Sequence, residues 1–270
     1  MGVQSISISQ SLANALNAAG NRSGVDFDYL LQTAMRESSL NPEASAPNSS
    51  AVGLFQFLEG TWLQVMKEEG PRLGYETYAN AISRTTNGDY VVADASARAQ
   101  ILKLRENPQI AADLAAAFTR SNGEYLRNEF GRMPSPGELY IAHFAGARGA
   151  EKMFKAGLED PNQRAADLFP RQAEANRSVF FDQDGQARTI RQVYQFLVAK
   201  HDVSGGSQFR VQQMEGENAA TAPVTEPALP SRFSEENLSF EGLFKNTPQP
   251  SLDDETAPAD PAFFTQLYSQ

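Results

Sequence analysis

The first 201 residues repeat one pattern, in which apolar side chains recur at helical spacing between glycine, proline and capping residues. The clearest stripe follows the positions i, i+3, i+4, i+7 and i+8: Phe27, Leu30, Leu31, Ala34 and Met35. Such a stripe predicts an amphipathic helix that buries one face against other helices. This pattern constrains the fold more than any other feature of the sequence, because a helical period does not suit a strand.

The same pattern, with its start and stop residues, predicts a series of helices. We expect them over Ser9–Ala19, stopped by Gly20; from the N-cap Asp26 to near Ser38; from Thr61 to Gly70; over Ala93–Arg105, Pro108–Phe130, Ala150–Ala156 and Asn162–Leu168; from Pro136 through Phe144; and from Thr189 through Leu197. Turns at Asn87-Gly88 and Asp184-Gly185 predict small hairpins at most. The fold class is therefore mainly α.

The composition changes after residue 201. Residues 202–270 hold 11 of the 33 acidic residues, only 3 of the 23 basic residues and 7 of the 15 prolines. A polar, acidic segment without periodicity predicts disorder. We therefore divide the chain into a helical domain at 1–201 and a flexible acidic tail at 202–270, in which the apolar segments Phe233–Phe244 and Phe263–Tyr268 are candidates for docking onto a partner.

Composition excludes several classes of protein. The chain has no cysteine and only two histidines, so thiolate metal sites and multi-histidine metal sites are not expected, and we predict no cofactor. A net charge of −10 argues against a nucleic-acid partner. No apolar run is long enough for a membrane span, and residues 1–20 lack the features of a standard secretory signal.

Glu37 is the best candidate for chemistry. It lies at the margin of the apolar stripe and in the last turn of its predicted helix. Partial burial and the negative end of a helix dipole both raise the pKa of a carboxyl group. A carboxylic acid that stays protonated near neutral pH is suited to general-acid catalysis.

Three short segments occur around Glu37 in a fixed order: Glu37-Ser38, Gly53-Leu54-Phe55-Gln56, and Ala142-His143-Phe144-Ala145-Gly146. In this order they resemble the acidic "ES" pair, the "GLMQ" turn and the "AYNAG" segment of the soluble lytic transglycosylases, which are relatives of goose-type lysozyme. The resemblance extends over roughly residues 27–153. In the third segment, His143 stands where the family has tyrosine and Phe144 where it has asparagine.

The resemblance implies a lysozyme-like helical fold and peptidoglycan as the substrate. It implies that Glu37 is the catalytic acid and that Gln56, His143 and a loop serine, for which Ser45 is the best match, contact the glycan. Tyr140 is a further candidate to line the glycan groove, because aromatic faces stack on sugars. For Gln56, His143, Tyr140 and Ser45 a purely structural role remains the alternative.

The implied reaction cleaves the β-1,4 bond between N-acetylmuramic acid and N-acetylglucosamine and leaves 1,6-anhydromuramoyl ends. One alternative is lysozyme-type hydrolysis, for which Asp89 or Asp94 is the candidate second carboxylate. The other is a non-catalytic protein that binds glycan. A periplasmic or cell-wall location follows from the substrate, by non-standard export or with the leader missing, and a flagellar, pilus or secretion-apparatus protein is the partner class expected for the tail.

Overall fold

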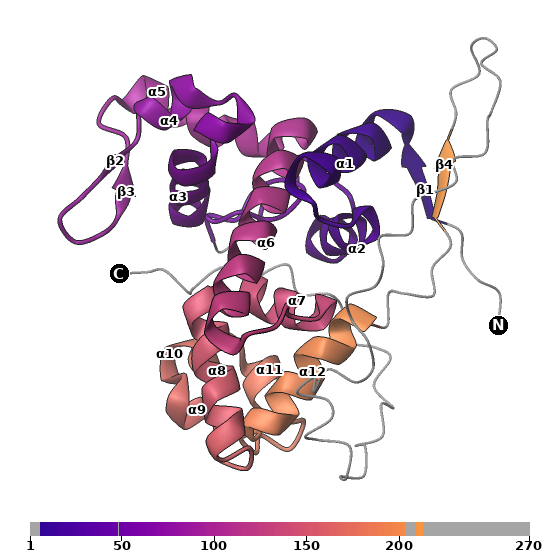
Figure 1. The fold of residues 1–270 in the computed structure, drawn as a ribbon, viewed down its shortest axis with the longest axis vertical. Helices are drawn as coiled ribbons and strands as arrows, with labels where there is room; N and C mark the ends of the chain where they lie inside the picture. The colour runs from indigo at the N-terminus through magenta and orange to yellow at the C-terminus, as the bar shows by residue number, and fades with distance from the viewer. Residues whose placement is uncertain (1–5, 48, 203–208, 213–270) are drawn as a thin grey trace.

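The computed structural model describes residues 6–47, 49–202 and 209–212, and these residues are mostly helical (Figure 1). The helices of the first half are α1 (Gln10–Ser23), α2 (Phe27–Ser38), α3 (Glu59–Glu69), α4 (Glu76–Asn80), α5 (Ala95–Lys103) and the 3-10 turns η1 (Pro71–Leu73) and η2 (Leu104–Glu106). The second half contains α6 (Pro108–Phe130), α7 (Pro136–Ala145), α8 (Ala147–Glu159), α9 (Ala165–Leu168), α10 (Pro170–Ala175), α11 (Arg177–Phe180) and α12 (Ile190–Asp202). The predicted fold class, mainly α with small β elements, is confirmed.

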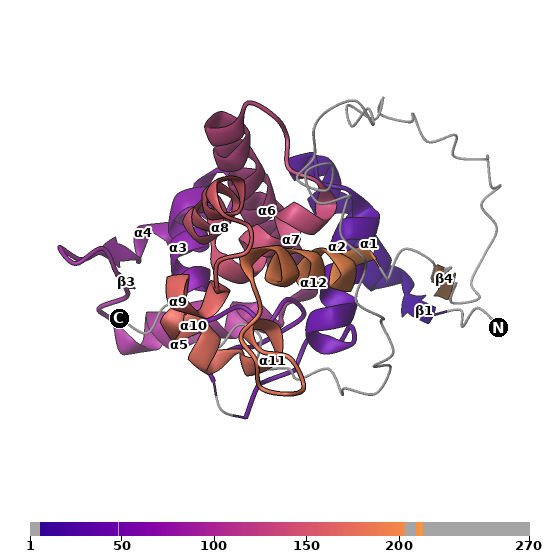
Figure 2. The ribbon, with the colours of Figure 1, turned by 90° about the horizontal axis from the view of Figure 1, so that it is seen from below.

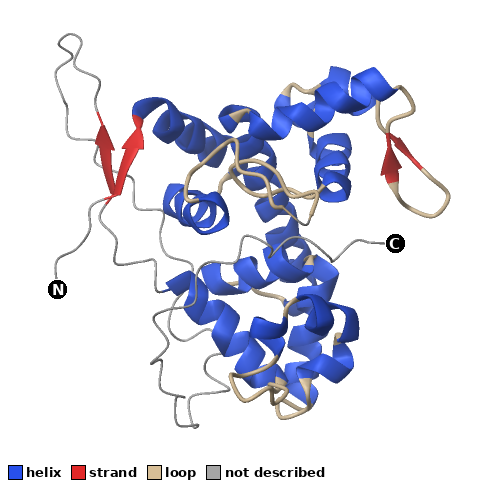
Figure 3. Cartoon of the chain, turned by 180° about the vertical axis from the view of Figure 1, so that it is seen from behind, coloured by secondary structure: helices blue, strands red, loops and turns tan. Residues whose placement is uncertain are grey.

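Two small sheets lie on opposite sides of the helices (Figure 3). The strands β2 (Ser83–Arg84) and β3 (Tyr90–Val91) form the antiparallel hairpin that the Asn87-Gly88 turn predicts. The strands β1 (Ile6–Ser9) and β4 (Phe209–Gln212) pair in parallel. Thus β4 lies beyond residue 201, within the segment predicted to be a flexible tail, whereas Phe233–Phe244 and Phe263–Tyr268 lie outside the described residues.

The core consists of two main apolar clusters that share α6. The first cluster packs α1, α2, α3 and the first half of α6, where buried alanines at 111, 112 and 115–117 let the neighbouring helices approach closely. The second cluster packs α7, α8 and α12 around Leu126 near the end of α6. The long helix α6 therefore runs from one lobe into the other, and α2 and α7 meet it near the middle of the molecule (Figures 1 and 2).

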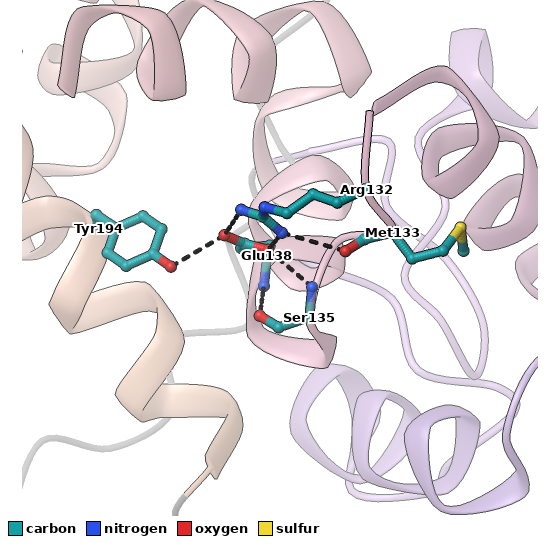
Figure 4. A network of polar contacts seen from close by, with 5 residues as sticks. All are labelled: Arg132, Met133, Ser135, Glu138 and Tyr194. Carbon is teal, nitrogen blue, oxygen red and sulfur yellow. Dashed lines mark hydrogen bonds and ion pairs between the residues drawn. The ribbon is translucent and has the colours of Figure 1, made fainter. Parts of the chain in front are cut away.

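A buried polar network fixes the start of α7 in the second lobe (Figure 4). The carboxylate of Glu138 accepts from both guanidinium NH groups of Arg132, at 2.8 and 2.7 Å, and from the backbone N–H of Ser135 at 2.7 Å. The hydroxyl of Tyr194 on α12 donates to the same carboxylate at 3.1 Å. Ser135 caps the helix in return, so this network ties α7 to α12 and to the loop after α6.

Each predicted helix is present, and Pro108–Phe130 agrees at both ends, but α8 extends three residues beyond both predicted limits, and the short helices α4, α10 and α11 were not predicted. The prediction that Gly20 stops the first helix is wrong, because α1 continues to Ser23 and ends at Gly24, which has φ 67°. Gly20 instead allows close packing, since a Cβ there would lie 2.6 Å from the carbonyl oxygen of Val25. Within the described ranges, no helix combines the length and apolar character needed to cross a membrane.

Candidate active site

Glu37 lies in the last turn of α2, and the sequence around it shapes that turn. The side chain of Asp26 caps the helix start by accepting from the backbone N–H groups of Asp28 and Tyr29, at 2.8 and 3.2 Å. After Ser38 the chain turns sharply, because Ser39 and Leu40 both adopt left-handed backbone angles. The Glu37 side chain is only 5% exposed, which is more burial than its place at the margin of the stripe predicts.

Ser38 joins the first motif to the second. Its hydroxyl donates to the backbone carbonyl of Leu54 at 2.8 Å, across 16 residues of sequence. The turn that receives this bond is itself held by the N–H of Gly53, which donates to the carbonyl of Ala44 at 2.7 Å. The residue after the catalytic candidate thus fixes the end of α2 against the Gly53–Gln56 turn.

Gly53 is required by the close packing of this turn. Its φ is +88°, and an added Cβ would lie 2.0 Å from the backbone carbonyl oxygen of Arg105. No other residue type fits there without moving the backbone. Gly53 therefore lets this turn pack directly against the backbone of η2.

Gln56 is almost completely buried, at 1% exposure, and adopts a left-handed backbone with φ 47°. Its Nε2 donates to the carbonyls of Ala44 and Gly53, at 3.1 and 2.9 Å. Its Oε1 is buried and has no hydrogen-bond partner among the described residues. The donor side of the amide thus holds the turn, and the acceptor oxygen is the part of the side chain without a partner among the described residues.

The third motif reaches α2 through aromatic contacts. The guanidinium of Arg36 lies over the Tyr140 ring, 4.4 Å from its centroid. The Tyr140 ring stacks on His143 with centroids 6.3 Å apart, and His143 lies 6.1 Å from Phe118 of α6. We call the region where α2, α6 and α7 meet, around Glu37, Tyr140 and His143, the polar junction.

Burial and charge determine the protonation states at the polar junction. Burial, followed by the nearby charge of Arg36, lowers the pKa of His143 to about 3, so its imidazole is neutral at physiological pH. Burial raises the pKa of the Tyr29 and Tyr140 hydroxyls well above the usual range, and the charge of Glu37 adds to both shifts. Both hydroxyls therefore keep their protons.

The predicted site residues occupy different environments. Tyr140 and His143, at 1% and 5% exposure, lie with Glu37 at the polar junction. Gln56 belongs to the same turn as Leu54, whose carbonyl accepts the hydrogen bond from Ser38 at the end of α2. Ser45 is exposed on the preceding loop, where it pairs with Val52 as an isolated β-bridge.

Other polar residues on the inner face of α2 were not predicted from the sequence. Tyr29, Thr33 and Arg36 precede Glu37 by eight, four and one residues, and the first two share its face of the helix. Both are buried, and the Thr33 hydroxyl donates to the Tyr29 carbonyl at 2.8 Å. The four-residue spacing of Tyr29, Thr33 and Glu37 could have indicated this polar face, but the apolar stripe of the same helix is the stronger pattern.

The candidate second carboxylates lie elsewhere. Asp94 caps α5 by accepting from the N–H of Ala97 at 2.7 Å, and Asp89 belongs to the β2–β3 hairpin. This hairpin and α2 lie on opposite sides of α3 in both views (Figures 1 and 2). Across the part of the chain that the structure describes, no three His, Asp or Glu side chains are grouped to hold a metal ion.

A comparison with protein families supports the assignment of this region. Residues 14–88 match the family model described as "Transglycosylase SLT domain". This match confirms the resemblance seen in the sequence. The match includes Glu37-Ser38 and the Gly53–Gln56 turn, whereas the third motif, at 142–146, lies outside it. The match supports a glycan-cleaving function of the lytic transglycosylase or lysozyme type, with peptidoglycan as the substrate.

Proposed function

We propose that this protein is a peptidoglycan lytic transglycosylase and that Glu37 is its single catalytic carboxyl group. The observation that carries the proposal is the buried position of Glu37 at the end of α2, within the segment that matches the transglycosylase family. A buried carboxyl group beside neutral tyrosine hydroxyls is a suitable general acid.

In the proposed reaction, Glu37 donates its proton to the oxygen of the β-1,4 bond between N-acetylmuramic acid and N-acetylglucosamine. The C1–O bond of the muramoyl residue breaks as that proton is transferred. The Glu37 carboxylate then accepts the proton of the muramoyl 6-hydroxyl, whose oxygen bonds to C1 and closes a 1,6-anhydro ring. One carboxyl group serves as acid and then as base, and no water is consumed.

The surrounding residues have supporting roles in this proposal. The neutral imidazole of His143 can donate a hydrogen bond from one ring nitrogen and accept one at the other. It does not titrate near neutral pH. Tyr140 and Arg36 hold the end of α2 against α7. Gln56 supplies an acceptor oxygen for an acetamido N–H, and Ser45 is exposed beside the turn for contact with the glycan.

The local roles of Asp94, which caps α5, and of Asp89, which belongs to the β2–β3 hairpin, support transglycosylation over hydrolysis, because a hydrolase needs a second carboxyl group that faces the same bond as the first. A periplasmic or cell-wall location, and recruitment through residues 202–270 by a flagellar, pilus or secretion assembly, belong to the same proposal.

Zymography with purified sacculi tests whether the protein is an enzyme. We expect the wild-type protein to clear the gel and the Glu37→Gln variant to bind sacculi without clearing. Binding by both proteins with no clearing by either would instead identify a non-catalytic glycan-binding protein.

A further inference from the structure

Asn122, on α6, is a buried polar residue that none of the three motifs includes. The side chain is only 5% exposed, and its Nδ2 has no hydrogen-bond partner among the described residues. A buried amide donor without a partner destabilises a fold, so a residue of this kind needs an explanation.

The neighbours of Asn122 on α6 place it at the polar junction. One turn earlier on the same face, Phe118 lies against His143, with ring centroids 6.1 Å apart. The next residue, Gly123, faces the start of α7, because a Cβ there would lie 3.2 Å from Leu139. The two helices thus run in opposite directions, and Asn122 lies level with the α7 segment between Leu139 and His143. This segment contains Tyr140, the residue that contacts Arg36 beside Glu37.

The environment of Thr119 agrees with this placement. Thr119 is buried and lies one turn before Asn122 on α6. Its side chain lies close to the Tyr29 hydroxyl of α2 and lowers the pKa of that hydroxyl. Residues 118, 119 and 122 therefore line the side of α6 that faces both α2 and α7, between the two apolar clusters.

We propose that Asn122 is a substrate-binding residue of the Glu37 site, whose amide Nδ2 donates a hydrogen bond to the acetamido carbonyl of the bound glycan. The inference rests on the proposed function, since it assumes an N-acetylated glycan at the junction. An amide carbonyl is the natural acceptor for an amide donor, and a donor already withdrawn from water has no hydration to lose on binding. The Oε1 of Gln56 is the complementary unpaired acceptor.

The first test separates binding from structure. The Asn122→Leu variant removes an unpaired donor and keeps an apolar side chain of similar size, so its melting temperature should stay equal or rise, while kcat/KM on sacculi falls at least tenfold. The matched control is Asn176→Leu, because Asn176 is also buried but its Nδ2 donates to the Gln172 carbonyl at 3.1 Å. That control should lose melting temperature and keep its activity per folded molecule. The opposite result for Asn122→Leu, a lower melting temperature with unchanged kcat/KM, would make Asn122 structural.

The second test identifies the group on the glycan. Chemically de-N-acetylated glycan strands, with re-acetylated strands as their control, are given to the wild-type enzyme and to Asn122→Leu. We expect the wild type to lose at least tenfold in kcat/KM on the de-N-acetylated strands and the variant to lose much less, because the two changes remove the same bond. Equal losses for both proteins would overturn the acetamido contact. Failure of the wild type to cleave any glycan would overturn the proposed function itself, which is a distinct outcome.

Discussion

The two lobes of the molecule each bury a glutamate, and the two glutamates have opposite surroundings. Glu138 opens α7, at the end of a helix dipole that favours an anion, and accepts hydrogen bonds from Arg132, Ser135 and Tyr194 (Figure 4). Glu37 ends α2, at the end of a dipole that disfavours an anion, beside the tyrosine hydroxyls of the polar junction. Burial alone therefore does not distinguish the proposed catalytic acid from a structural glutamate, whereas the helix end at which each residue lies does.

The comparison predicts the largest effect for a change at Glu37. We expect Glu37→Gln to lower kcat on sacculi by about 10²–10⁴-fold, the usual contribution of a general acid, because glutamine has no proton to give to the leaving oxygen. The variant should keep the wild-type melting temperature, since the amide has the shape of the acid. The exposed Glu43→Gln is the control and should retain full activity. Activity within tenfold of wild type would remove Glu37 from the acid role.

Glu138 should show the reverse pattern. Glu138→Gln breaks a bidentate ion pair whose carboxylate side chain has 0% exposure, so we expect the free energy of unfolding to fall by about 3–5 kcal/mol. Activity per folded molecule should change far less than in Glu37→Gln. The control is Glu124→Gln, whose side chain is 46% exposed in its pair with Arg120 and should contribute less than about 1 kcal/mol. Urea denaturation of the two variants measures both values, and equal values would contradict a structural role for Glu138.

A smaller effect is expected at Gly53, in the turn that Ser38 contacts. Gly53→Ala places a methyl group against the Arg105 carbonyl, whereas Gly74→Ala meets no atom within 4 Å at nearly the same φ, 89° against 88°. Both variants carry the cost of a left-handed alanine, so their difference isolates the clash. We expect Gly53→Ala to lower the free energy of unfolding by about 1–3 kcal/mol more than Gly74→Ala does, as measured by denaturation. Equal losses would show that the turn rearranges to accommodate the methyl group at no further cost in stability.

The last prediction concerns His143 and pH. The folded protein holds His143 neutral down to a pKa of about 3, whereas the unfolded chain protonates it near 6.5. Acid therefore favours the unfolded chain. The contribution of neutral His143 to the free energy of unfolding is complete above pH 6.5. It decreases by about 1.4 kcal/mol per pH unit as the pH falls toward 3.

The variant His143→Gln should lack this component. The difference in unfolding free energy between wild type and variant, measured from pH 7 to pH 4, gives the slope directly. A difference that does not change with pH would show that His143 is accessible to protons in the folded state.

Much of the fold could be predicted because the helix signals are local. Asp26, Asn107-Pro108 and Thr189 each cap or begin the helix that the sequence assigns to them. The errors arise where tertiary packing decides. Gly20 lies inside α1 because only a glycine fits against Val25, which no local pattern reveals.

The candidate site divides in the same way. The sequence could propose Glu37 and the Gly53–Gln56 turn, because short motifs contain them. The burial of Tyr29, Thr33 and Asn122 could not be predicted, because it depends on which helix packs opposite. The strand β4 was also missed, since its partner β1 lies some 200 residues away in sequence.

Whether Glu37 alone converts the glycan to an anhydro product can be measured by digesting sacculi in ¹⁸O-labelled water and analysing the released muropeptides by mass spectrometry. We expect 1,6-anhydromuramoyl ends without ¹⁸O from the wild-type enzyme, and no such ends from Glu37→Gln. Reducing ends that carry ¹⁸O at C1 would contradict this expectation, because they would show that water is the nucleophile and that a second group activates it.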